Sequence, residues 1–378
     1  MARNRIIYQS EAVFVSDDIS STGLNTHNNI NRVQSANYGF TINRQDINQY
    51  GQLSRLDSIA IESPLVSLDL SYYLTDGYNE QFLNLETDPS VGFLSGQMAT
   101  SSGQNFYIIT TPEGKDAASG DYSNFDVISI GNAFLTDYSV NFGVGQIPTV
   151  NTSFEAANIS SQIQLTRQSD FFSGIENASV DPVTNIKNTN QIRLPPSINK
   201  HSPAPAISPK DVTVTISNSS AITNLSTNES GAHIQTASIN IPIERSPLQR
   251  LGTTIPYARA IDFPLNINFS LNAVLNEINQ KNLSNILDNP EEFSIRISCT
   301  DSLNDFCRYD ISGARLVSES FSSSIGSNRV ADLTFSAQIG GPIDTKNNIF
   351  FRGNQLVGLA TEGGAYLKTE ANETLILE

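Results

Sequence analysis

An internal repeat constrains the fold of this chain more than any other feature of its sequence. Residues 130–154 resemble residues 311–335, and every matched position differs by 181 residues without a gap. Both segments run from an apolar start through an alternating stretch to a glycine, Gly145 in the first and Gly326 in the second. A repeat at fixed spacing indicates that one structural unit is written twice.

A looser match precedes the first one. Residues 41–43 parallel residues 238–240 at a spacing of 197, and Pro64 parallels Pro264 at a spacing of 200. We interpret the unequal spacings as surface loops of different length. The repeat predicts a first domain at 1–165, a Pro-rich connector at 166–210, a second domain at 211–345, and a C-terminal β-hairpin or arm at 346–378 with a turn at residues 363–364.

Alternation of apolar and polar residues predicts the strands. Val66, Leu68 and Leu70 alternate with polar residues, and residues 134–144 do the same. Side chains on a strand point to opposite faces, so such strands have one core face and one polar face, as in antiparallel sheets. The predicted fold class is mostly β: two tandem domains, each with two packed antiparallel sheets in a β-sandwich or barrel and a flanking helix.

Apolar spacing near 3.6 predicts that flanking helix in the second half. It covers residues 271–287 and is followed by Pro290, which cannot continue a helix. The first half has only a short equivalent near residues 79–85.

The charge of the chain argues against a nucleic-acid grip. The net charge is −16, only 16% of residues are charged, and no basic stripe is present. The acidity serves either solubility or tolerance of a nearby polyanion without binding it. The N-terminus lacks the apolar stretch of a secretory signal, and no window is apolar enough for a membrane span.

Motifs for chemistry are missing from the sequence. Residues 143–146 lack the third glycine of a dinucleotide fingerprint, and residues 76–80 favour a turn over a Ca²⁺ loop. Cys299 and Cys307 are predicted to be small buried thiols, with a cross-strand disulfide or a metal site as the alternatives. We therefore expect no catalytic residues, no cofactor and no metal, and we expect that the chain is not an enzyme.

Three stretches carry a resemblance to a known family. At residues 33–38, 42–51 and 64–80 the chain resembles the major tail tube proteins of long-tailed bacteriophages, and residues 140–156 and 321–337 look like their paired inner strands. The resemblance implies rings whose strands close into one inner β-barrel, stacked into a hollow conduit for DNA ejection in the virion. Two domains per chain imply a homotrimeric, pseudo-hexameric ring.

The resemblance also implies partners and a lumen. The expected partners are further copies of the chain, other tail proteins (tail tip or baseplate, terminator, tape measure) and passing duplex DNA without specific binding, with no membrane. The polar strand faces are predicted to face the lumen, through Asp69, Ser71, Asp137, Ser139, Asn141, Ser153, Glu155, Ser320, Ser322, Asp332 and Thr334.

Other functions stay open on the sequence alone. A virion surface or decoration protein, or a sugar-binding adhesion β-protein, would also be rich in Asn and Ser. A polysaccharide-degrading enzyme would need a carboxylate pair in a cleft. Within the family, the sequence does not separate a contractile from a non-contractile tail, or a tube body from a tube initiator or cap.

Overall fold

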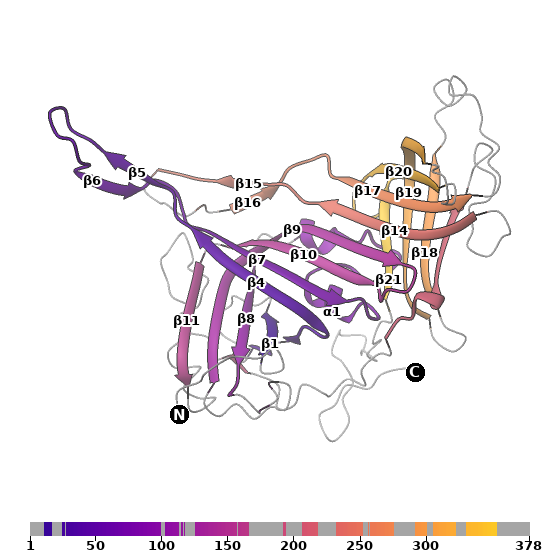
Figure 1. Ribbon diagram of the computed structural model, residues 1–378, viewed down its shortest axis with the longest axis horizontal. Helices are drawn as coiled ribbons and strands as arrows, with labels where there is room; N and C mark the ends of the chain where they lie inside the picture. The colour runs from indigo at the N-terminus through magenta and orange to yellow at the C-terminus, as the bar shows by residue number, and fades with distance from the viewer. Residues whose placement is uncertain are drawn as a thin grey trace.

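The computed structural model describes residues 11–16, 25–26, 28–99, 103–112, 115, 117, 125–156, 158–165, 192–193, 206–217, 232–251, 256, 258–275, 292–300, 305–322 and 330–353. Within them the fold is mostly β, with antiparallel sheets packed as in a β-sandwich (Figure 1), which confirms the predicted fold class. Most of the predicted connector and the turn at residues 363–364 lie outside the described residues.

Eight strands form one continuous antiparallel sheet, which we call the shared sheet. Four strands of the first half are followed by four strands of the second half, and the seam between the halves is the pairing of β9 with β14. In pairing order the strands are β4 (Val33–Thr41), β7 (Leu65–Tyr73), β10 (Thr149–Ala156), β9 (Phe125–Gly143), β14 (Ala232–Pro242), β17 (Asn266–Leu275), β20 (Val330–Gln338) and β19 (Asp305–Ser322).

A second layer of strands lies against each half of the shared sheet. The first halves of the long strands β9 and β19 belong to this layer, and their second halves belong to the shared sheet. With β9 pair β8 (Gln104–Thr110) and β11 (Asn158–Leu165), and beyond β8 lie β1 (Glu11–Ser16) and β3 (Asn28–Asn29). With β19 pair β18 (Phe293–Thr300) and β21 (Asn348–Gly353), and beyond β18 lies β13 (Val212–Ser217).

Two hairpin arms project from the shared sheet to the same side (Figure 1). The first arm is β5 (Arg44–Ile47) with β6 (Asp57–Ala60), and the second is β15 (Arg245–Leu248) with β16 (Ala258–Ile261). The remaining elements are the helices α1 (Tyr78–Phe82), α2 (Ser95–Ala99) and η4 (Pro209–Asp211), and the short parallel pair β2 (Asn25–Thr26) and β12 (Ile192–Arg193).

The core lies between the two layers because alternate residues of each strand point inward. Along β7 every second residue from Val66 onward is buried. In each half a ring pair bridges the layers, and the two pairs include the matched residues Phe154 and Phe335. The rings of Phe106 and Phe154 lie 4.7 Å apart in the first half, and those of Phe293 and Phe335 lie 5.5 Å apart in the second.

The strand registers show a repeat spacing that the sequence comparison missed. Leu68 pairs with Phe154, and Phe269 pairs with Phe335. Residues 154 and 335 differ by the predicted 181, whereas residues 68 and 269 differ by 201. The first β-bulge of β4, at Gln34, and that of β14, at Gln235, also differ by 201. The spacings of 197 and 200 were therefore wrong, and no gap separates the two copies between residues 33 and 73.

Three local predictions need correction. Residues 271–275 are strand, since β17 pairs with β14 on one side and β20 on the other; residues 276–287 of the predicted helix lie outside the described residues. Residues 348–353 form β21 in the outer layer of the second half, so they are not part of a C-terminal arm. Leu135 is buried although the alternation placed it on the polar face, because a bulge at Thr136 shifts the register. The short helix near residues 79–85 is confirmed as α1.

Candidate functional site

The structure brings all eleven predicted polar residues onto one face of the shared sheet. None of them is buried, whereas most of their described neighbours along the strands are buried in the core. Cross-strand registers join them: Asp69 and Asp137 both pair with Ser153, and Ser320 pairs with Asp332. Whether this face lines a lumen stays a prediction, because the single chain has no inside or outside.

One line of paired residues shows how uniform this polar face is. It crosses six adjacent strands without interruption, and every residue in it carries a hydroxyl or an amide. In order across the sheet these residues are Thr149, Asn141, Ser238, Ser270, Thr334 and Ser318. The face therefore spans both halves and crosses the seam with no change in chemistry.

Charge on the polar face is sparse and acidic. Four of the eleven residues are carboxylates, and none is Lys or Arg. Arg259 Nη1 of the second arm lies 2.6 Å from Glu155 Oε2, and Asn272 donates to Asp332. Burial raises the pKa of Asp137. The eleven residues themselves offer a phosphate backbone no cationic contact. Arg315, which pairs with Ser336 on the same face, is exposed, and its Nη2 lies 2.9 Å from Glu292 Oε1.

Beneath the seam, a buried carboxyl group is linked to the second half of the chain through a pair of tyrosines. Glu80 Oε1 of α1 accepts hydrogen bonds from the hydroxyls of Tyr72 (2.9 Å) and Tyr138 (3.3 Å), and the Tyr138 hydroxyl lies 2.8 Å from that of Tyr309 in the second half. Oε2 has no hydrogen-bond partner among the described residues. Burial is the main cause that raises the pKa of Glu80 to about 7, and the two tyrosine hydrogen bonds oppose it.

Phe93 completes this joint between the halves. Its ring contacts those of Tyr138 (5.1 Å between centroids), Tyr309 (6.1 Å) and Phe351 (5.4 Å). The backbone around it is also tied to the second half, because Phe93 N donates to the Ile349 carbonyl. The halves are therefore held together by aromatic packing as well as by the β9–β14 ladder.

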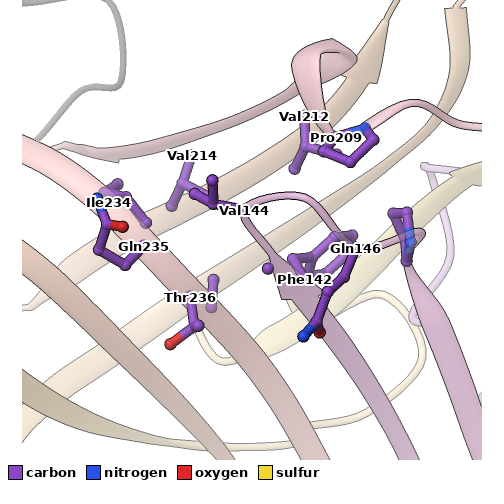
Figure 2. Close-up of a pocket in the computed structure, with 12 residues that line it drawn as sticks. Phe142, Val144, Gln146, Pro209, Val212, Val214, Ile234, Gln235 and Thr236 are labelled. Atoms are coloured by element: carbon purple, nitrogen blue, oxygen red, sulfur yellow. The ribbon is translucent and has the colours of Figure 1, made fainter.

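A small hollow at the seam is too small for a ligand. It has a volume of about 60 Å³ and lies between the β9–β10 turn, β13 and the start of β14. Figure 2 shows that the side chains around it, such as Val144, Val214 and Ile234, are mostly apolar. Ligand pockets usually enclose about 300–1,000 Å³, so we interpret the hollow as imperfect packing where the halves meet.

The two cysteines are buried free thiols, as predicted. Cys299 and Cys307 pair directly across β18 and β19. Burial, together with the neighbouring Cys299, raises the pKa of Cys307 well above its usual value. Within the described residues no group of three His, Cys, Asp or Glu side chains could hold a metal ion, and no helix is long and apolar enough to cross a membrane.

Sequence reasoning missed the exposed apolar residues at the free edge of the shared sheet. Tyr38 and Phe40 of β4 lie on the core face of their strand, yet they are 43% and 62% exposed. Their counterparts at a spacing of 201, Ile239 and Ile241 of β14, are fully buried against β9. A sequence signal for this edge was present: Gln34 of β4 and Gln235 of β14 are identical residues 201 positions apart. This match would have shown that β4 is the counterpart of a strand that is buried at the seam.

Comparison with known proteins gives only a distant likeness. No family model and no curated relative matches the chain. Matching solved structures include a chain of the anti-feeding prophage (AFP) baseplate, with 12% identity, a TM-score of 0.27, and coverage of 40% of this chain and 99% of that chain. An Hcp protein matches with 9% identity, a TM-score of 0.20, and coverage of 38% and 98%. TM-scores this low carry no weight for function.

Proposed function

We propose that this chain is the structural subunit of a bacteriophage tail tube, which stacks in rings to form a hollow conduit for DNA. The observation that supports this role best is the polar face, which runs without a break over eight strands from two halves of one chain. A sheet with two free edges needs partners for its unpaired backbone groups. Closure into a barrel supplies them and turns the polar face into a lining. The role is structural and involves no catalysis.

Three copies would give a channel wide enough for a DNA duplex. Eight strands per chain make about 24 strands, which at about 4.8 Å per strand give a circumference of about 115 Å and a backbone diameter of about 37 Å before tilt. Strand tilt widens this further, and membrane barrels of about 16–18 strands already enclose a water-filled channel. Six copies would double the circumference.

The arms supply surface for contacts between stacked rings. Tyr50 and Leu53 at the tip of the first arm and Leu251 at the tip of the second are fully exposed. Exposed apolar groups on a projecting hairpin are typical of interaction sites. Because both arms project to the same side (Figure 1), each ring would present six of them to the next ring.

Electron microscopy of the purified protein tests the proposed function directly. We expect rings or hollow rods whose cross-sections sharpen under threefold averaging. Strict sixfold averaging should blur them, because the two halves differ in sequence at most positions. A protein that stays monomeric at all concentrations, or forms solid fibres, would contradict the tube assignment. Hollow tubes with six whole chains per ring would contradict only the stoichiometry.

Arginines placed on the polar face should create DNA retention. Asn141 and Asn268 are exposed on central strands of this face, so Asn141→Arg/Asn268→Arg adds cationic contacts inside the proposed channel. We expect assembled particles of this variant to co-sediment with linear duplex DNA at least ~10-fold more than wild type at low salt, with the difference lost as salt rises.

The matched control for this test is Gln81→Arg/Thr215→Arg, which adds the same charge at exposed positions away from the polar face. Equal DNA retention by both variants would show that net charge alone matters. It would count against a lumenal position of the polar face.

A further inference from the structure

We propose that β4 of one copy pairs with the second half of β19 of the next copy, in the register that β14 and β9 show inside the chain. This inference rests on the proposed function, and it names the partner and the residue pairs of ring closure. Among the described residues, β4 pairs only with β7, and residues 315–322 of β19 pair only with β20. These are the two free edges of the shared sheet.

The internal seam is the template for this pairing. β14 pairs with β9 from Thr236 opposite Gly143 to Pro242 opposite Asp137. At its two ends Ile243 N donates to the Thr136 carbonyl and Val144 N donates to the Gln235 carbonyl. Because β4 corresponds to β14 and β19 corresponds to β9, the same chain already contains one example of the contact between a β4-type and a β9-type strand.

The repeat spacings of 201 and 181 residues predict which residues pair between the two copies. Subtracting 201 from β14 positions and adding 181 to β9 positions gives five pairs whose members are all in described strands. These pairs are Asn37 with Ser322, Tyr38 with Phe321, Gly39 with Ser320, Phe40 with Glu319, and Thr41 with Ser318. Asn37, Gly39 and Thr41 then continue the polar face across the new seam.

The exposed fractions of matched side chains support the use of the internal seam as a template for the free edge. Ile239 and Ile241 are 0% exposed where β9 lies beside β14, whereas Tyr38 and Phe40 at the same positions of β4 are 43% and 62% exposed. A second copy seated on this edge would cover these two aromatic rings. Burial of apolar area stabilises association by about 25 cal/mol per Å² before the costs of binding.

A residue at the base of the first arm also supports the pairing of β4 with β19. In the second arm Arg245 Nε donates to the Leu135 carbonyl of β9, and its guanidinium stacks over Phe134. The equivalent residue of the first arm is Arg44, which is exposed. The equivalent acceptor is the carbonyl of Leu316 on β19. Arg44 is therefore placed to donate to the Leu316 carbonyl of the next copy, as Arg245 donates to that of Leu135. The stacking has no equivalent there, because the counterpart of Phe134 is Arg315.

A designed disulfide tests the register. The hydrogen bonds at the ends of the internal ladder place Asn240 and Ser139 at a non-hydrogen-bonded position, where Cα atoms are closest, and Gly39 and Ser320 are their counterparts. A Cβ added at Gly39 has no atom closer than 3.9 Å. We expect Gly39→Cys/Ser320→Cys to give a covalent trimer on oxidation. On a non-reducing gel the trimer band should hold more than half of the protein, and reduction should remove it.

The control moves one cysteine by two residues, to Gly39→Cys/Ser318→Cys. The diagonal Cα separation of ~7–8 Å exceeds the reach of most disulfides, so this variant should form less than a tenth of the trimer. If the control cross-links and the designed pair does not, while micrographs still show rings, the register is wrong and the tube assignment survives. If neither pair cross-links and wild type forms no rings, both the register and the proposed function fail.

Discussion

Phe93→Ala should lower the free energy of unfolding by about 3–5 kcal/mol, the usual cost of removing a fully buried phenylalanine ring. Phe93 is 0% exposed and its ring contacts three aromatic rings, two of which belong to the second half of the chain. The cavity would lie at the joint of the halves. Chemical denaturation of the unassembled chain, followed by circular dichroism, measures the loss.

Phe40→Ala is the matched control, because it removes the same ring from an exposed position on β4. In the unassembled chain it should cost less than about 1 kcal/mol. In assembly the order should reverse, since Phe40→Ala should reduce ring formation while folding stays intact. Equal loss of stability in the two variants would contradict the described burial of Phe93.

Stability should fall as pH rises through neutrality, because of Glu80. Its ordinary pKa is 4.5, and in the folded chain burial raises the pKa to about 7. The folded state therefore holds this proton more tightly than the unfolded state does. The contribution is fully present below about pH 4.5 and is lost as pH rises through about 7. The total is about 3 kcal/mol.

Glu80→Gln isolates this contribution. Glutamine keeps the shape and an oxygen that accepts from Tyr72 and Tyr138, but it carries no proton to lose. We expect the variant to match wild type near pH 4.5 and to exceed it by up to about 3 kcal/mol at pH 8, measured by denaturant unfolding at each pH. Other titrating groups cancel in this difference. Parallel stability curves for the two proteins would show that Glu80 is not the buried titrating group.

Strand positions and the polar face were predictable because both depend on a local period of two. Asp69 and Ser153 were assigned to the same face from separate strands, and the structure pairs them. The prediction of a helix at residues 271–287 was wrong over its first turn, because a short apolar run fits both the helical period of about 3.6 and the strand period of two. The decisive factor was the ladder on both sides of β17, which local sequence does not show.

Two features depended on information that no single segment holds. The 201 spacing was missed because few residues are identical between β4 and β14, whereas backbone register preserves the match. Glu80 was interpreted only as part of a turn at residues 76–80. Only the position of α1 beneath the tyrosines of β7, β9 and β19 makes this residue a buried one.

In the proposed ring, the duplicated four-strand unit would affect how accurately the number of units is fixed during assembly. A chain with one unit could close by mistake with five or seven, which changes the angle between neighbours only modestly. A chain with two units adds them in pairs, so the nearest wrong rings contain four or eight units. The angle between neighbouring units would then have to change from about 60° to about 90° or about 45°. In the proposed ring of three chains, half of the seams would moreover lie within a chain, like the β9–β14 seam. In the proposed ring, two units in one chain would therefore make a wrong number of units less favourable without any additional contacts.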